Sequence, residues 1–79
     1  MVKVKVEKIE KHTEGPFYLT IWFKIGGELL RTKLTREHLI NLRNKDKIPK
    51  KLMLGQLLHV CKRKGRGEVD LYYIYAYDK

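Results

Sequence analysis

Residues 17–34, FYLTIWFKIGGELLRTKL, contain the pattern that decides the fold of this 79-residue chain. Two runs of alternating apolar and polar residues flank Gly26 and Gly27. A two-residue turn that matches the twist of a β-hairpin needs positive φ angles, which glycine adopts freely. The stretch therefore predicts an antiparallel hairpin in which Ile25 faces Glu28, and this pair sets the register for residues 17–25 against 28–34.

The predicted register divides the hairpin into two faces. The first is almost wholly apolar and is expected to cover a core; its pairs are Phe23 with Leu30, Ile21 with Thr32, and Leu19 with Leu34. The second is aromatic and cationic; it contains Tyr18, Thr20, Trp22 and Lys24, opposed by Leu29, Arg31 and Lys33. Bases stack on flat rings and phosphates attract cations, so this second face suits single-stranded nucleic acid. The alternative is that Trp22 and Tyr18 lie beneath a loop or helix, and that the cations are ordinary solvated side chains.

Composition supports a folded, basic protein. The chain has 43% hydrophobic residues and a length that predicts one small domain, residues 1–79. It carries 18 Lys and Arg against 9 Asp and Glu, and the formal net charge of +9 favours a polyanionic partner such as nucleic acid. We expect no membrane partner and an intracellular, cytoplasmic location, because no apolar run is long enough for a transmembrane helix or a signal peptide. Abundant charge with few Asn and Gln residues leans toward a thermophilic source.

No catalytic or metal-binding constellation stands out. Cys61 is the single cysteine, which excludes an internal disulfide and a multi-cysteine zinc site. The three histidines lack the spacing of metal ligands. Cys61 and His59 share a strand face without a third orienting group, so they do not make a nucleophile and base. We therefore expect a protein that is not an enzyme and that needs no metal or cofactor.

The remaining elements are predicted in chain order. Residues 2–11 alternate as a half-buried strand, but Ile9 falls on the wrong parity, so a bulge is expected near Glu7 and Lys8. Residues 12–16 have the composition of a loop. A short helix should follow Leu34, capped by Thr35, with Leu39, Ile40 and Leu42 as its apolar stripe.

Residues 50–64 allow two interpretations. As a helix, the segment has Leu54, Leu57, Leu58 and Cys61 at helical spacing. As a strand, it begins at Gly55 and turns through a basic tip, residues 63–66, into the tyrosine-rich residues 68–77. Gly55 weakens a helix interior, and the tyrosine-rich strand needs a neighbour, so the strand is favoured. A four-residue loop would then pair Val60 with Val69, and Leu58 with Leu71.

The predicted order is strand, strand, strand, helix, strand, strand, in a mostly β chain. In a basic protein of this length, with a bent first strand, a helix after RTKL and a glycine-led LMLGQLLHV, this order resembles the OB-fold, a five-stranded Greek-key barrel. OB domains bind oligonucleotides or oligosaccharides across strands 2 and 3 and the adjoining loops. The resemblance implies a nucleic-acid site flanked by residues 12–16 and made of Tyr18, Trp22, Lys24, Arg31, Lys33, Arg63, Lys64 and Arg66.

Two functions of different classes follow. The first is binding of single-stranded DNA or RNA with little sequence preference, by base stacking and phosphate contacts. The second is a small protein-interaction or inhibitor module, which could be homodimeric. The register assumed for the last hairpin places Leu57, Tyr72 and Ile74 together on its outward side, and such an apolar patch fits a protein partner or a second copy.

Overall fold

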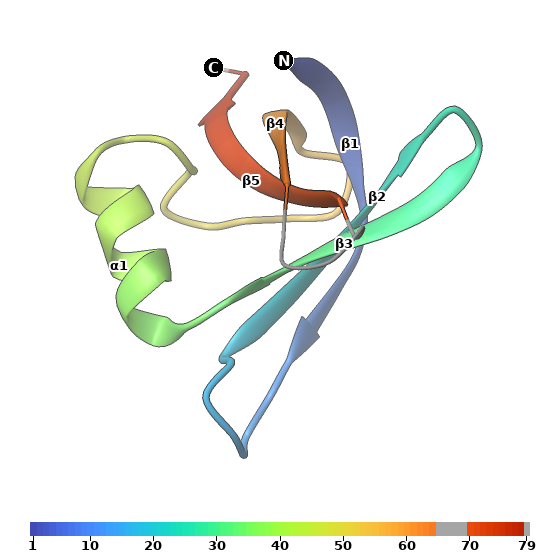
Figure 1. Ribbon diagram of the computed structural model, residues 1–79. Coiled ribbons are helices and arrows are strands. Elements are labelled where there is room, and N and C mark those ends of the chain that lie inside the picture. The colour runs from blue at the N-terminus through green and yellow to red at the C-terminus, as the bar shows by residue number, and fades with distance from the viewer. Residues whose placement is uncertain (65–69, 79) are drawn as a thin grey trace.

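The computed structural model describes residues 1–64 and 70–78, in which five antiparallel strands and one helix form a curled half-barrel (Figure 1). The elements are β1 (Val2–Lys11), β2 (Leu19–Ile25), β3 (Glu28–Leu34), α1 (Arg36–Asn44), β4 (Leu57–Lys64) and β5 (Asp70–Tyr77). Their order in the sheet is β3-β2-β1-β4-β5, so β3 and β5 are its two edges. The predicted mostly β fold and the predicted order of elements are confirmed.

The β2–β3 hairpin has the predicted register. Ile25 faces Glu28, and the pairing continues without interruption to Leu19 opposite Leu34. Gly26 and Gly27 have φ angles of 59° and 81°, the left-handed conformation that a tight hairpin turn requires. The apolar face is buried as expected, with Ile21 and Phe23 fully inaccessible. Figure 1 shows the turn of this hairpin on the opposite side of the molecule from α1.

Strand β1 joins the two halves of the sheet. Its first residues pair with β4, from Val2 to Lys5, and its later residues pair with β2, from Val6 to Lys11. The register against β2 shifts between Val6 and Lys8, which confirms the predicted bulge. The extra residue returns Ile9 to the core side, where it packs against buried side chains opposite Ile21.

Helix α1 begins where the sequence predicts. The Thr35 hydroxyl accepts a hydrogen bond from the backbone N–H of His38 at 3.1 Å, which satisfies one of the free donors of the first turn. Leu39 and Leu42 are buried, but Ile40 is exposed. Residues three apart share a helix face whereas adjacent residues do not. The buried stripe of the helix therefore contains Leu39 and Leu42 without Ile40, and it is narrower than predicted.

Strand β4 decides the ambiguity of residues 50–64. Residues 57–64 are extended and paired with β5, so the helical alternative is wrong. Gly55 has a φ of 85° just before the strand. Its N–H donates to the Val6 carbonyl at 2.9 Å, and the Val6 N–H donates to the Gln56 carbonyl at the same distance. These bonds extend the β1–β4 pairing and begin the strand.

The register of the β4–β5 hairpin differs from the prediction. Val60 pairs with Ile74 and Leu58 with Tyr77, with an irregularity between His59 and Val60. Arg63 and Lys64, which were predicted in the loop, lie within β4. The basic tip specifies no tight turn type, so the assumed four-residue loop had no stereochemical support. Val69 and Arg66 lie outside the described residues.

The new register overturns the predicted outward patch. Ile74 is only 3% exposed, and Tyr72 is half-buried with its ring edge-to-face against Phe23 at 5.9 Å between centroids. An odd shift in pairing moves every side chain to the other face of a sheet, so Tyr72 and Ile74 turn inward. The large apolar side chains of β5 that are exposed are instead Leu71, Tyr73 and Tyr75.

The two edge strands approach each other across the open side of the half-barrel. The Thr32 hydroxyl on β3 donates to the backbone carbonyl of Tyr72 on β5 at 3.1 Å. The core beneath is formed by buried side chains of every element and of Ile48 in the connection between α1 and β4: Val4, Val6, Leu19, Ile21, Phe23, Leu34, Leu39, Leu42, Ile48, Leu58, Val60 and Ile74. The packed core therefore fixes the position of the β2–β3 hairpin and of the open edge beside it.

Candidate nucleic-acid interface

Trp22 lies at the centre of the outer face of β2 and β3. Its indole N–H donates to the Glu10 carboxylate on β1 at 2.6 Å. The Arg31 guanidinium lies 5.4 Å from the ring centroid, and the Lys8 ammonium lies 5.7 Å from it. The side chain is half-buried and belongs to the outer face, as predicted. The two cations over its ring come from the neighbouring strands β1 and β3, whereas Tyr18 packs against the core and has Arg36 of helix α1 over its ring.

The same arrangement of a cation over an aromatic ring recurs toward the end of the hairpin. The Lys33 ammonium lies 5.5 Å from the Phe17 ring, and the Arg36 guanidinium lies 4.8 Å from the Tyr18 ring. Among the described residues, no carboxylate forms an ion pair with Arg31, Lys33 or Arg36. We call the cations Arg31, Lys33 and Arg36 with the rings of Phe17, Tyr18 and Trp22 the cation–aromatic row.

A groove runs from this row to the open edge of the half-barrel. Its volume is about 870 Å³, and side chains from both edge strands line it. The lining residues are Phe17, Trp22, Leu29, Leu30, Arg31, Thr32, Lys33, His38, Arg63, Leu71, Tyr72 and Tyr73. The groove thus combines flat rings, exposed apolar groups and cations, which is the composition that a single nucleic-acid strand needs.

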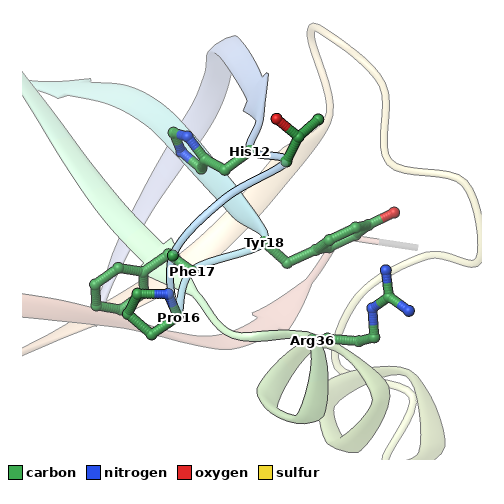
Figure 2. A pocket seen from close by; sticks show the side chains of 7 residues that line it. His12, Pro16, Phe17, Tyr18 and Arg36 are labelled. Carbon is green, nitrogen blue, oxygen red and sulfur yellow. The ribbon is translucent and has the colours of Figure 1, made fainter.

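A second, smaller pocket of about 160 Å³ adjoins the groove at Phe17 (Figure 2). It is formed by the loop after β1 and the start of α1, with His12, Thr13, Gly15, Pro16, Phe17, Tyr18 and Arg36 as its lining. Figure 2 shows the Arg36 side chain rising toward the Tyr18 ring, with Pro16 and Phe17 side by side. The predicted flanking loop therefore lies next to the cation–aromatic row.

Thr20 departs from its expected exposure. It lies opposite Lys33 as predicted, but it is only 2% exposed. A hydrogen bond of 2.6 Å joins its hydroxyl to Nε2 of His12. The loop after β1 folds over this position, and the imidazole supplies the polar partner that a buried hydroxyl requires.

The structure brings together most of the predicted site residues, but not all of them. Trp22, Arg31, Lys33 and Arg63 line the groove, and Tyr18 lines the adjoining pocket. Lys24 is exposed near the hairpin turn and lines neither hollow. The Lys64 side chain and the whole of Arg66 lie outside the described part of the chain.

Three further residues of this surface were not predicted. Phe17 was assigned to the end of the hairpin, and Arg36 was treated only as part of the helix. Aromatic and cationic residues at the two ends of the central stretch are the signal that could have identified them. Tyr73 lines the groove because of the β4–β5 register, for which the sequence carried no clear signal.

The electrostatics of Tyr73 favour a neutral phenol. Cys61 lies opposite Tyr73 on β4, and hydrogen bonding with the Cys61 side chain is the main cause that raises the pKa of Tyr73 above its ordinary value of 10.0. The charge interaction with Cys61 acts in the same direction, whereas nearby Arg63 opposes it. The phenol therefore stays protonated near neutral pH and does not repel phosphate.

Comparison of the chain with protein-family models, curated proteins and solved structures finds no match. Within the described residues, no cluster of three or more His, Cys, Asp or Glu side chains could hold a metal ion. That part of the chain also contains no helix long and apolar enough to cross a membrane. The groove and the cation–aromatic row are therefore the features of the molecule that bear on its function.

Proposed function

We propose that this protein binds single-stranded DNA or RNA along the outer face of β2 and β3, with little sequence preference. The observation that supports this most strongly is the cation–aromatic row, in which cations rest on flat rings and no described carboxylate pairs with them. Every base offers a π-face for stacking, and every nucleotide carries a phosphate. A surface of this kind therefore binds nucleic acid without reading its sequence.

The cations can move from ring to phosphate at small cost. A cation–π contact at an exposed site is worth about 0.5–1 kcal/mol, which is less than stacking of a base on the same ring. Arg31 and Lys33 are two residues apart on one face of β3, about 6.6 Å along the strand. When a base stacks on Trp22, both side chains can turn outward and contact successive phosphates.

The fold supports the same assignment. A bent β1 shared between β2 and β4, and a helix between β3 and β4, are compatible with an OB-like barrel. OB domains use strands 2 and 3 for oligonucleotides and oligosaccharides. We propose that the chain is an OB-like module, and that its excess of 9 positive charges selects the polyanionic member of these two ligand classes.

Titration with fluorescent oligonucleotides tests the proposal. Single-stranded DNA, single-stranded RNA and duplexes of equal length are compared over a series of salt concentrations. We expect tighter binding of single strands, and a Trp22→Ala variant should lose about 1–3 kcal/mol of affinity with little dependence on salt. Trp22→Phe keeps a ring at the same position and should retain most of the affinity.

Two outcomes would contradict the proposal. One is an absence of oligonucleotide binding near physiological salt. The other is wild-type affinity in Trp22→Ala, with binding lost only when cations are removed, since that pattern describes attraction by charge without stacking. Circular dichroism of each variant separates a binding defect from unfolding.

A protein-interaction module remains the second candidate, and the exposed apolar side chains beside the groove favour it. Leu29 on β3 and Leu71 on β5 are 50% and 44% exposed and line the same groove. Exposed apolar groups gathered in a groove often bind a protein partner. This hypothesis predicts no oligonucleotide affinity, and instead an association measured by analytical ultracentrifugation that is lost in Leu71→Asp.

A further inference from the structure

We infer that the bound strand crosses the open edge of the half-barrel from β3 to β5, where Tyr73 stacks a second base. This inference rests on the proposed function, because it extends the path of the same ligand. Trp22 and Tyr73 come from different hairpins and line one groove. A strand that stacks on Trp22 therefore has a continuous hollow leading to a second exposed ring.

The two sides of the groove offer the same kinds of contact. On the β3 side, the Trp22 ring is accompanied by Arg31 and Lys33; on the β5 side, Tyr73 is accompanied by Arg63 of β4. Tyr73 is 39% exposed, so a base can reach its ring. Each side thus has a ring for stacking and a cation for phosphate, the combination that recurs in single-strand binding surfaces.

The edge strands β3 and β5 lie close enough for a bound nucleic-acid strand to pass from one to the other. Thr32 on β3 donates to the Tyr72 carbonyl at 3.1 Å, so the two edge strands are in contact at that point. A single nucleic-acid strand is flexible and can follow the surface of the groove where it turns from β3 to β5. A duplex is stiff, with a persistence length of about 150 base pairs, so bending it along such a path costs free energy that a single strand does not need.

Tyr75 shows why exposure alone does not make a stacking site. It lies two residues beyond Tyr73 on the same outward face of β5 and is 49% exposed, more than Tyr73. However, it is outside the groove, and the Lys47 ammonium lies 5.6 Å from its ring centroid. Tyr75 is therefore a matched control of the same residue type on the same strand.

The test compares Tyr73→Ala with Tyr75→Ala in the full chain, using labelled single strands of graded length. OB domains cover about 4 to 16 nucleotides, which sets the range of lengths. For the longer strands, Tyr73→Ala should weaken binding roughly 5- to 150-fold, and Tyr75→Ala should bind as the wild type does. For the shortest strands, which cover only the β2–β3 face, Tyr73→Ala should have no effect.

A set of conservative variants separates stacking from folding. Tyr73→Phe keeps the ring and should bind as the wild type does, because the hydroxyl is not the stacking group. Tyr73→Leu keeps an apolar side chain on the strand without a ring and should bind as weakly as Tyr73→Ala. Equal affinities for Tyr73→Phe and Tyr73→Ala, both below wild type, would overturn a role in stacking.

The failure of this inference differs from a failure of the proposed function. If Trp22→Ala weakens binding while Tyr73→Ala and Tyr75→Ala are both unchanged at every length, the strand ends on β3 and the inference is wrong. If Trp22→Ala is also unchanged, the proposed stacking surface itself is wrong.

Discussion

The cations of this protein are used differently on two sides of the half-barrel. On the outer face of β2 and β3, Arg31 and Lys33 rest on aromatic rings. Where β1, β4 and the end of the chain meet, Lys3 forms an ion pair with Asp78 at 3.1 Å, and His59 lies 3.8 Å from the same carboxylate. Lys3 is thus paired with a carboxylate, whereas Arg31 and Lys33 have no ion-pair partner among the described residues.

This difference shows which charges are available to a ligand. A carboxylate cancels most of the field of a lysine beside it, whereas a ring leaves the field of the cation almost unchanged. An exposed cation–π contact is also weak, about 0.5–1 kcal/mol, so a phosphate can displace it. Sequence composition counts both kinds of cation equally, and their structural surroundings separate them.

Among changes of charge, the largest expected effect comes from removing two cations of the row together. Each phosphate contact to a single strand contributes about 0.7 to the slope of log affinity against log salt, so Arg31→Ala with Lys33→Ala should lower the slope by about 1.4. At about 0.1 M salt this corresponds to roughly 25-fold weaker binding. Oligonucleotide titrations at several salt concentrations give both quantities.

Lys3→Ala is the matched control for Lys33→Ala, because both remove one lysine from an exposed position on a strand. We expect a lower salt slope for Lys33→Ala and an unchanged slope for Lys3→Ala. Equal slopes for the two variants would show that total charge, and not its placement over rings, governs binding.

Lys8 is close to both a carboxylate and an aromatic ring. Its removal should therefore weaken oligonucleotide binding more than Lys3→Ala and less than Lys33→Ala. The Lys8 ammonium is 3.7 Å from the Glu10 carboxylate and 5.7 Å from the Trp22 ring centroid. Because the carboxylate partly compensates the charge, Lys8→Ala should weaken binding by less than the roughly fivefold expected for one full phosphate contact at 0.1 M salt. A loss larger than that of Lys33→Ala, measured in the same titration, would contradict this ranking.

Glu10→Gln should change affinity in the opposite direction. The amide oxygen can still accept the Trp22 indole N–H, which Glu10 accepts at 2.6 Å, but the negative charge that repels phosphate is removed. Surface charge effects are worth up to about 1 kcal/mol, so binding should strengthen by up to about fivefold at low salt. Asp78→Asn removes a carboxylate on the other side and should leave the affinity unchanged.

The smallest expected effect is on the free energy of unfolding, when the Lys3–Asp78 ion pair is removed. Lys3→Ala breaks an ion pair whose two side chains are about half exposed, 52% and 42%, and solvent screens such pairs. The free energy of unfolding, measured by urea denaturation, should fall by less than about 1 kcal/mol. A larger loss would mean that the Lys3–Asp78 contact holds the end of β5 in place.

The β2–β3 hairpin was predictable because its turn is local. Two adjacent glycines permit one tight geometry, and that geometry sets which residues face each other over the whole hairpin. Burial of Phe23 and partial exposure of Trp22 follow from this register by simple alternation. The bulge in β1 was predictable for a similar reason, since Ile9 reaches the core only if one extra residue is inserted.

The β4–β5 hairpin was not predictable in the same way. Its connection is longer and specifies no single turn, so several registers align apolar residues equally well. The chosen register placed Leu71 inside and Ile74 outside, and the structure reverses both. The wrong register also affected the prediction of function. It turned Tyr73 toward the core, and it placed Tyr72 and Ile74 in an outward apolar patch that is in fact partly buried.

Local pattern in the chain was sufficient for every strand except β4, and for the helix start, the central hairpin and the excess of cations. These features depend on alternation, on the conformational freedom of glycine and on formal charge. All three follow from the residues themselves, without knowledge of which distant segments pair. The partners of Trp22 on β1 and β3, the cover of His12 over Thr20, and the groove shared by β3 and β5 were decided only in the tertiary structure. Each depends on how segments far apart in the chain pair and curl, and many such pairings bury similar apolar area until the whole core is packed.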